Sequence, residues 1–210
     1  MDDKILIMIN EEEKKLNENC PANIFHIAVT GHRHIIVDEV LINSIRQILN
    51  RIVKENSFAE IFLYSALAEG SDQLLASISL DYQEIKLIVP LPLNIEDYLL
   101  DFNTQTGIVE FHNLLRSASE IITLPAVANH QLAYINLSEF LVENCECLIA
   151  IWDGEYTMKK GGTGDVVSMA LKAGKLVYWI FSENQNERGS NTLKKPKKSG
   201  EIKVLVKNIG

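Results

Sequence analysis

The sequence lacks long hydrophobic runs and has few cysteines, and these two absences narrow the class of protein. No apolar run approaches the roughly 20 residues of a membrane-spanning helix. The first residues lack the basic and long apolar regions of a secretory signal, so we expect a cytoplasmic protein with no membrane partner. Cys20, Cys145 and Cys147 give an odd count and no metal-ligand spacing. We therefore expect structural thiols in a reducing compartment and no metal site.

Positive charge is scarce outside the last part of the chain. The net charge is −8, yet the residues from Ser182 onward carry seven Lys/Arg and three Asp/Glu, or +4, which leaves −12 for the rest. Nucleic-acid binding needs clustered Lys and Arg, so nucleic acid is an unlikely partner for the body. The lysines at 194, 195, 197 and 198 favour a solvated tail, with contact to an acidic partner as the alternative.

The chain has the size and apolar content of one domain with extra ends. Its 210 residues are 47% apolar, and no repeat of 20–50 residues is present. Residues 1–22 are charged, lack a wide apolar stripe and end near Pro21, which predicts an N-terminal extension. We expect one domain over residues 23–182 and a basic C-terminal tail over residues 183–210.

Short apolar runs alternate with helical patterns through this domain. Continuous apolarity in the runs is typical of strands buried on both faces, and the alternation indicates βαβ units. The sequence therefore predicts an α/β fold: a doubly wound, mainly parallel sheet with helices on both faces. The expected strands are 24–29, 60–64, 85–89, 120–124, 147–152 and 176–181, and the expected helical segments are 38–54, 71–80, 94–118, 131–143 and 164–173.

Parallel sheets bind ligands beyond the carboxyl ends of their strands, so the residues that follow each strand are the candidates. Thr30, Gly31, His32 and Arg33 follow the first strand. Gly31 permits a tight turn, His32 can donate a hydrogen bond or titrate, and Arg33 can clamp a phosphate or carboxylate. The alternative is a turn with exposed basic side chains.

A first glycine turn follows the second strand and opens a helix. Glu69 and Asp72 flank Gly70 and Ser71 there. Ser71 or Asp72 would cap the helix in the structural interpretation, which we weigh equally with a binding role. In the binding role, Asp72 would contact a hydroxyl or a base, and Glu69 would do the same or act as a general base if its pKa is raised.

A second glycine turn gives the strongest local signal. Asp153 and Gly154 follow the fifth strand, and the helix after them opens with Gly161, Gly162, Thr163, Gly164 and Asp165. Unpaired amides and the positive end of the helix dipole favour an anion at such a start. Two such starts on one sheet predict a nucleotide-type pocket, and a flexible surface loop is the alternative. Tyr98, Asp101 and Phe102 would form a side wall or simply pack.

Five ordered blocks over residues 24–181 resemble the SLOG superfamily of Rossmann-like proteins, which is related to the LONELY GUY phosphoribohydrolases and the DNA-processing protein fold. The blocks are Thr30-Gly31-His32-Arg33; Ala68-Glu69-Gly70-Ser71-Asp72; Pro90-Leu91-Pro92 with Tyr98, Asp101 and Phe102; Ala133-Tyr134 with Trp152-Asp153-Gly154; and Gly161-Gly162-Thr163-Gly164-Asp165. The resemblance implies a Rossmann-like fold and a nucleotide-type ligand, with no obligatory cofactor. Some relatives sense cyclic or ADP-ribose-type signals in antiviral defence, and related domains often form homo-oligomers.

The chain departs from the phosphoribohydrolase motif Gly-Gly-x-Gly-Thr-x-x-Glu. Asp165 stands in place of the Thr and Ser168 in place of the catalytic Glu, so that catalytic role is not carried over. We therefore expect a module that binds or senses a nucleotide-derived ligand. One alternative is a nucleotide hydrolase that uses Glu69 or Asp153 as the catalytic carboxylate, and a second is a protein-interaction scaffold that uses the basic tail.

Overall fold

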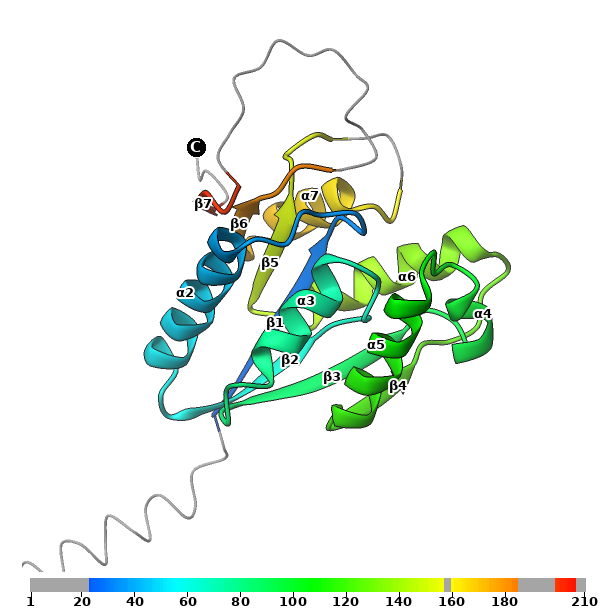
Figure 1. Ribbon diagram of the computed structural model, residues 1–210, viewed down its shortest axis with the longest axis horizontal. Coiled ribbons are helices and arrows are strands. Elements are labelled where there is room, and N and C mark those ends of the chain that lie inside the picture. Colours follow the sequence, from blue (N-terminus) through cyan, green and yellow to red (C-terminus); the bar gives the residue numbers. More distant parts are fainter. Residues whose placement is uncertain (1–22, 157–159, 185–198, 207–210) are drawn as a thin grey trace, which may run out of the picture.

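In the computed structural model, residues 23–156, 160–184 and 199–206 are described, and these residues form a seven-stranded sheet (Figure 1). The strand order is β4-β3-β2-β1-β5-β6-β7, with neighbouring strands parallel except for the antiparallel pair β6 and β7. The strands are β1 (Asn23–Gly31), β2 (Ala59–Tyr64), β3 (Ile85–Leu91), β4 (Glu120–Thr123), β5 (Cys147–Trp152), β6 (Leu176–Phe181) and β7 (Ile202–Leu205).

Helices cover both faces of this sheet. From β1 the chain steps outward to β2, β3 and β4, and it then returns to β5 and steps the other way to β6. Right-handed crossovers therefore put α2, α3 and α5 on one face and α6 and α7 on the other (Figure 1). The helices are α2 (Glu39–Glu55), α3 (Ser71–Ser79), α4 (Ile95–Leu99), α5 (Gln105–Ser117), α6 (His130–Glu143) and α7 (Thr163–Lys172). The predicted fold class is confirmed.

The apolar patterns explain why these elements form. Every residue of β5 is buried, as expected for a central strand covered on both faces. Helix α2 buries one stripe that includes Leu41, Ile45 and Ile48, and it begins where the Asp38 side chain accepts a hydrogen bond from the Leu41 amide at 2.8 Å. No helix in the described ranges is long and apolar enough to cross a membrane.

One strand lies in the segment that the sequence assigned to the basic tail. Strand β7 pairs with β6 from Val177↔Leu205 to Ile180↔Ile202. The turn before it is anchored by Gly200, whose amide donates to the Phe181 carbonyl at 2.8 Å and whose carbonyl accepts from Ser44 Oγ at 2.7 Å. A four-residue strand with Lys203 at its centre carries too little apolar pattern to be predicted. The predicted extension 1–22 and the four clustered lysines lie outside the described residues.

Candidate functional site

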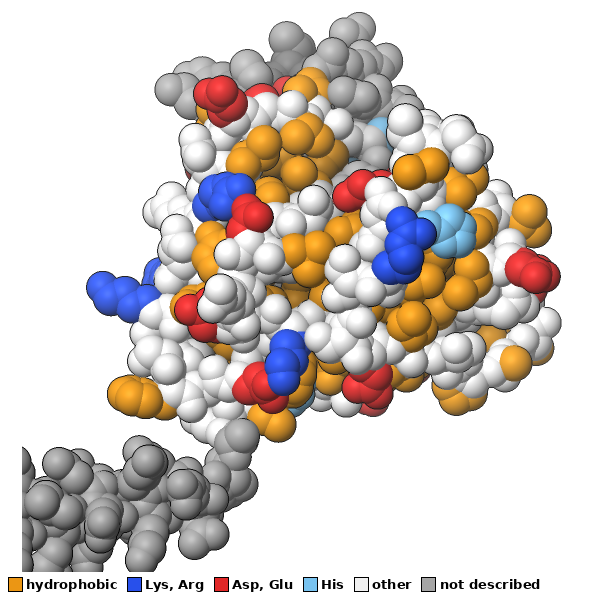
Figure 2. All heavy atoms as spheres, turned by 60° about the horizontal axis from the view of Figure 1, so that its bottom comes forward, with side chains coloured by type: hydrophobic (Ala, Val, Ile, Leu, Met, Phe, Trp, Pro, Cys, Tyr) orange, Lys and Arg blue, Asp and Glu red, His pale blue; other side chains and the backbone are white. Residues whose placement is uncertain are grey.

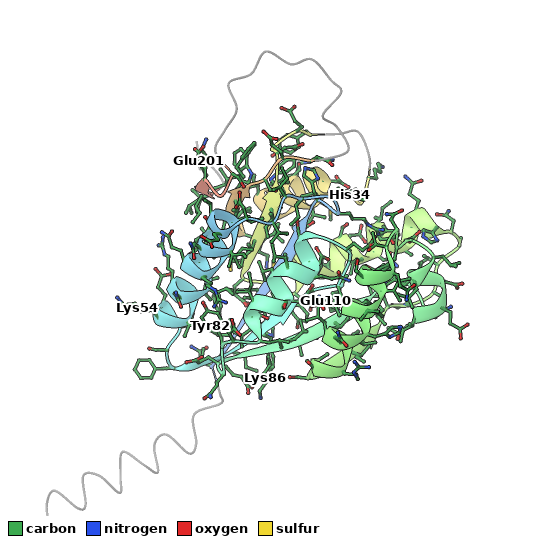
Figure 3. The ribbon with its side chains drawn as sticks, viewed as in Figure 1. His34, Lys54, Tyr82, Lys86, Glu110 and Glu201 are labelled. Atoms are coloured by element: carbon green, nitrogen blue, oxygen red, sulfur yellow. The ribbon has the colours of Figure 1, made fainter. Side chains whose placement is uncertain are left out.

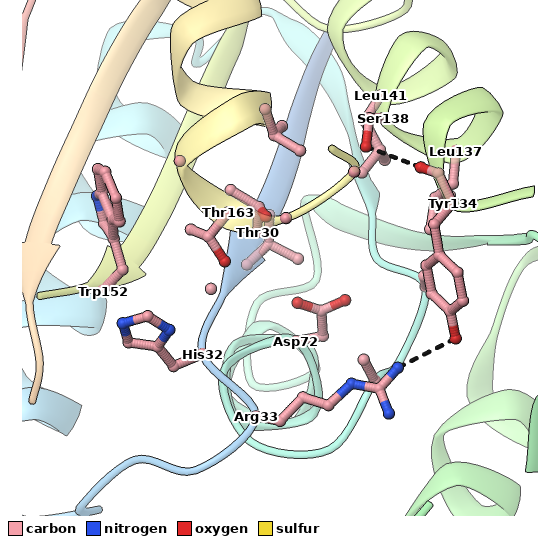
Figure 4. Close-up of a pocket in the computed structure, with 18 of the residues that line it drawn as sticks. Thr30, His32, Arg33, Asp72, Tyr134, Leu137, Ser138, Leu141, Trp152 and Thr163 are labelled. Atoms are coloured by element: carbon pink, nitrogen blue, oxygen red, sulfur yellow. Dashed lines mark hydrogen bonds between the residues drawn. The ribbon is translucent and has the colours of Figure 1, made fainter. Parts of the chain in front are cut away.

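A cavity of about 720 Å³ lies where the strand order reverses, beside the carboxyl ends of β1 and β5. This reversal is the position at which doubly wound sheets bind ligands. The starts of α3 and α7 and one side of α6 complete the walls (Figure 4). Of the residues predicted to bind the ligand, nine line it: Thr30, Gly31, His32, Arg33, Asp72, Gly161, Gly162, Thr163 and Gly164. The second glycine turn and Asp72, from the first, therefore lie at one cavity.

The start of α7 presents an uncapped helix N-terminus to the cavity. Gly162 is the N-cap and has no side chain to cap the helix. The Asp165 amide donates to the Gly162 carbonyl at 3.0 Å, but no acceptor within the described residues pairs with the Thr163 and Gly164 amides. The turn before it is held by Asp165, whose Oδ2 accepts from the Gly161 amide at 3.0 Å. Gly161 has φ +75, which favours glycine, whereas Gly162 has φ −89, which any residue adopts. Asp165 is thus a structural contact and does not line the cavity.

The start of α3 is closed by its own contacts. Ser71 is fully buried, and its Oγ donates to the His32 carbonyl at 2.9 Å while its amide donates to the same oxygen at 3.1 Å. Gly70 has φ +84, and a Cβ there would lie 2.3 Å from the Arg33 carbonyl oxygen. A Cβ on Gly31 would lie 2.4 Å from Ser71. These glycines let β1 and α3 approach closely, and Gly70 and Ser71 do not line the cavity.

The close packing of β1 against α3 places the Asp72 carboxyl at the cavity. Its side chain is only 8% exposed and is drawn between Arg33 and Thr163 in Figure 4. Burial raises the pKa of Asp72 to about 7, even though the Arg33 charge and the Ala68 amide lower it. Near neutral pH this carboxyl is therefore present in both protonation states. It can donate a hydrogen bond to a ligand as well as accept one.

Arg33 is held by groups from two other segments. Its Nη1 donates to the Asp101 carbonyl at 2.6 Å, and its Nη2 donates to the Tyr134 hydroxyl at 3.1 Å. That hydroxyl donates to Asp101 Oδ2 at 2.5 Å, and His130 Nε2 lies 2.7 Å from the same oxygen. Burial would raise the pKa of Asp101, but the hydrogen bonds from Tyr134 and His130 lower it. Two of the five N–H donors of Arg33 are therefore engaged in this cluster.

Helix α6 supplies cavity residues that sequence reasoning missed. His130 and Tyr134 line the cavity through the cluster just described. Tyr134 belongs to one of the blocks that carry the family resemblance, but no pattern marked it as a site residue. The apolar content of α6 is spread around the helix, which hides the polar side that faces Asp101. Of the three residues of the predicted side wall, Tyr98 and Asp101 line the cavity. Phe102 packs in the core.

Tyr98 combines full burial with an unpaired hydroxyl. The side chain is 0% exposed and its ring packs edge-on against Phe102 and Phe111. Its hydroxyl is enclosed and has no hydrogen-bond partner among the described residues. Burial raises the pKa of this phenol, and the nearby Asp72 carboxyl acts in the same direction. The hydroxyl therefore remains protonated in the folded protein.

Glu69, a catalytic candidate, serves a structural purpose. Its Oε1 accepts from Thr104 Oγ1 at 2.6 Å and from the Thr104 amide at 2.9 Å, and its Oε2 accepts from the Asn103 amide at 2.7 Å. Burial would raise the pKa of Glu69, but these hydrogen bonds lower it. The raised pKa that a general base would need is absent. Glu69 and Gly70 line a separate cavity of about 370 Å³ beside α5.

Asp153, the second catalytic candidate, supports a residue of the cavity wall. Its Oδ1 lies 3.1 Å from His32 Nε2 and accepts from the Glu155 amide at 2.8 Å. Burial would raise the pKa of Asp153, but the hydrogen bonds from His32 and Glu155 lower it. Gly154 has φ +85 and packs against the Trp179 ring. Asp153 thus orients the His32 ring, and neither Asp153 nor Gly154 lines the cavity.

Comparisons with known proteins add little to this geometry. No protein-family model matches the chain. No curated protein matches it either. Among solved structures, the chain is similar to the crystal structure of TM1055, a structural genomics target, at 11% identity over 72% of this chain and 71% of that chain, with a TM-score of 0.43. The Rossmann-like α/β class rests on the sheet topology given above.

Proposed function

We propose that this protein binds a nucleotide or nucleotide-derived ligand in the 720 Å³ cavity and acts as a binding or sensing module. The observation that carries the proposal is the uncapped N-terminus of α7 at the topological switch point of the sheet. Free helix amides and the helix dipole favour a phosphate group there. The volume lies within the range of about 300–1,000 Å³ that is usual for small-molecule sites.

The family resemblance supports the same proposal. Residues from each of the five blocks line the cavity, although the blocks are far apart along the chain. Membership of the SLOG superfamily would explain why polar and glycine residues recur at these strand ends. It would also suggest sensing of a cyclic or ADP-ribose-type signal, as some relatives do in antiviral defence.

A direct experiment is to look for a ligand that stays bound during purification. Native mass spectrometry of the freshly purified chain, compared with the mass of the denatured chain, would reveal it. Calorimetry against nucleotides, ADP-ribose species and cyclic dinucleotides would follow. A bound species with a nucleotide mass supports the proposal. Absence of heat across the panel at millimolar ligand contradicts it.

One observation favours a hydrolase as the second candidate. Asp72 is a cavity carboxyl with a pKa of about 7, a value suited to proton transfer near neutral pH. It would replace Glu69 and Asp153 as the acid–base residue in cleavage of an N-glycosidic or phosphate bond. Chromatography of each nucleotide after incubation with the protein tests this. Products that form with the wild type but not with Asp72→Asn would support an enzyme, and equal turnover by both would exclude this role for Asp72.

A further inference from the structure

On one side of the sheet, the amino ends of β1, β2 and β3 are not covered by any helix in the described ranges. Helices α6 and α7 lie on this side but pack mainly over β1, β5 and β6. Helix α6 reaches β2 at its last residue, Tyr64, whose ring contacts that of Phe140. Aligned and alternate residues of parallel strands share one side, which places five side chains together on the uncovered part. We call this surface the open sheet face, and it consists of Ile24, His26, Glu60, Phe62 and Lys86.

The open sheet face presents apolar surface, and its charges are already paired. Ile24 is 43% exposed, and the Phe62 ring is only partly buried. The His26 ring packs against Phe62 with 5.6 Å between the ring centroids, and Lys86 Nζ lies 5.9 Å from the centroid of the same ring. The Lys86 ammonium also forms an ion pair with the Glu60 carboxylate. Because contiguous exposed apolar surface marks a place of interaction, this face suits an apolar partner better than a charged one.

The chain itself carries an apolar run outside the described residues. Residues 5–9 read Ile-Leu-Ile-Met-Ile, and no comparable run lies elsewhere outside the described ranges. The described chain starts at Asn23, one residue before Ile24 of the open sheet face, and Figure 3 shows Lys86 at the end of the sheet where β1 begins. The 13 residues 10–22 join the run to β1. They span up to about 43 Å, whereas β3 lies about 10 Å from β1, so the run reaches the whole face.

We infer that residues 5–9 bind to the open sheet face of their own chain. The contact removes the five apolar side chains of the run from water, together with Ile24 and Phe62. A segment of the same chain is present at a high effective concentration, which favours it over a separate partner. The cavity lies at the carboxyl ends of the strands and this face at their amino ends, so the contact leaves the cavity open.

A nitroxide at position 8 tests this contact in the full chain. Met8→Cys together with Cys20→Ser supplies the attachment point, because the remaining cysteines are buried. We expect the backbone amide resonances of Phe62 and Lys86 to lose most of their intensity. The amide of Glu110, in α5 on the other side of the sheet, should keep its intensity (Figure 3).

Matched substitutions in the labelled chain identify the two partners of the contact. Ile7→Asp places a charge within the run and should restore the Phe62 and Lys86 intensities, whereas Leu16→Asp places the same charge outside the run and should leave them reduced. On the sheet, Phe62→Ala should restore the Lys86 intensity. Phe58→Ala removes a ring that is 96% exposed and lies outside the open sheet face, so it should leave the Lys86 intensity reduced.

Three results would overturn the inference. The first is full intensity at Phe62 and Lys86 in the labelled chain, and the second is an equal loss at Glu110. The third is a loss that persists when the nitroxide and the observed nuclei are on different chains, measured by mixing labelled chains with isotope-enriched chains that carry no nitroxide. That third result would place a second copy on the face. Equal effects of Ile7→Asp and Leu16→Asp would likewise contradict binding through the run.

Discussion

At the residue scale, two buried carboxyls three positions apart have opposite electrostatics. Glu69 accepts hydrogen bonds from the Asn103 and Thr104 amides and from the Thr104 hydroxyl, and its pKa falls. Asp72 receives less compensation for its burial, and its pKa rises to about 7. Glu69 therefore fixes the start of α5, whereas Asp72 is a poorly compensated carboxyl at the cavity.

Replacing Asp72 should stabilise the protein in a pH-dependent way. The unfolded side chain ionises near 3.8 and the folded one near 7, so the wild type loses stability as the pH rises between these values and no further above them. Asp72→Asn should therefore match the wild type near pH 4 and exceed it by up to about 4 kcal/mol at pH 8. Urea unfolding at several pH values measures this. The control is Asp81→Asn, which breaks an exposed ion pair with Arg46. A difference that does not grow with pH would contradict the account.

Replacing Glu69 should lower the free energy of unfolding, whereas replacing Asp72 should raise it. Glu69→Gln loses acceptor capacity for buried amides and should lower the free energy of unfolding by about 2 kcal/mol at pH 7. Because the folded pKa is below the ordinary 4.5, this stabilisation exists above that pH and fades as the pH falls through the folded value. Thermal unfolding at pH 7 and pH 3 checks both points, with the exposed Glu139→Gln as control. Unchanged stability at pH 7 would show that these hydrogen bonds do not hold α5.

At the element scale, the two glycine turns look alike in sequence and differ in structure. In each turn, a glycine precedes Ser or Thr, and an aspartate follows within the first helical turn, as in Gly70-Ser71-Asp72 and Gly162-Thr163-Gly164-Asp165. The α3 turn is filled, because the Ser71 amide and hydroxyl both reach the His32 carbonyl. At the α7 turn, the Thr163 and Gly164 amides have no acceptor in the described part of the chain. The sequence alone could not separate them, since the acceptor for the first turn comes from a loop 39 positions earlier.

Substitutions at the adjacent Gly161 and Gly162 of the α7 turn can separate an effect on folding from an effect on anion binding. Gly161 has φ +75, so Gly161→Val should lower the free energy of unfolding by about 1–2 kcal/mol. Gly162 has φ −89, so Gly162→Val should fold normally while its side chain blocks an anion from the helix amides. Thermal melts and a titration with inorganic phosphate distinguish these outcomes. A Gly162→Val protein that unfolds would mean that this glycine is required by the fold.

Strand β7 covers the edge of β6, and its removal should be costly. A chain that ends at residue 184 loses the antiparallel ladder and the Ser44–Gly200 hydrogen bond. At about 1 kcal/mol for each of several hydrogen bonds, we expect a loss of about 3 kcal/mol. Chemical unfolding of the truncated chain measures it. The control replaces only the lysines at 194, 195, 197 and 198 with glutamine, which removes their charge and keeps β7. Equal stability of truncated and full chains would contradict a structural role for β7.

At the scale of the whole molecule, much of the architecture could be predicted from the sequence. Continuous apolar runs such as β5 place strands, and their alternation with helices predicts a parallel sheet with its site at the strand ends. What could not be predicted depends on contacts between distant segments. The bonds that tie Arg33 to Asp101 and Tyr134 join three segments 68 and 101 positions apart, and no local pattern encodes them.

The Lys and Arg side chains of the folded body are dispersed on the face seen in Figure 2. Lys and Arg side chains lie apart from one another on the face shown in Figure 2, without a basic stripe. Several are paired with acids, as in Arg46–Asp81, Arg51–Glu55 and Lys86–Glu60. A nucleic-acid surface would need clustered, unpaired cations. The cations on this face therefore form no cluster of the kind that binds nucleic acid.

The most direct measurement of the central claim is calorimetric titration of ADP-ribose into the wild type and into Gly162→Val. The account predicts one site per chain in the wild type and at least a tenfold loss of affinity in a variant that melts at the wild-type temperature. Binding of equal strength to both proteins would place the anion somewhere other than the start of α7 and would contradict the account.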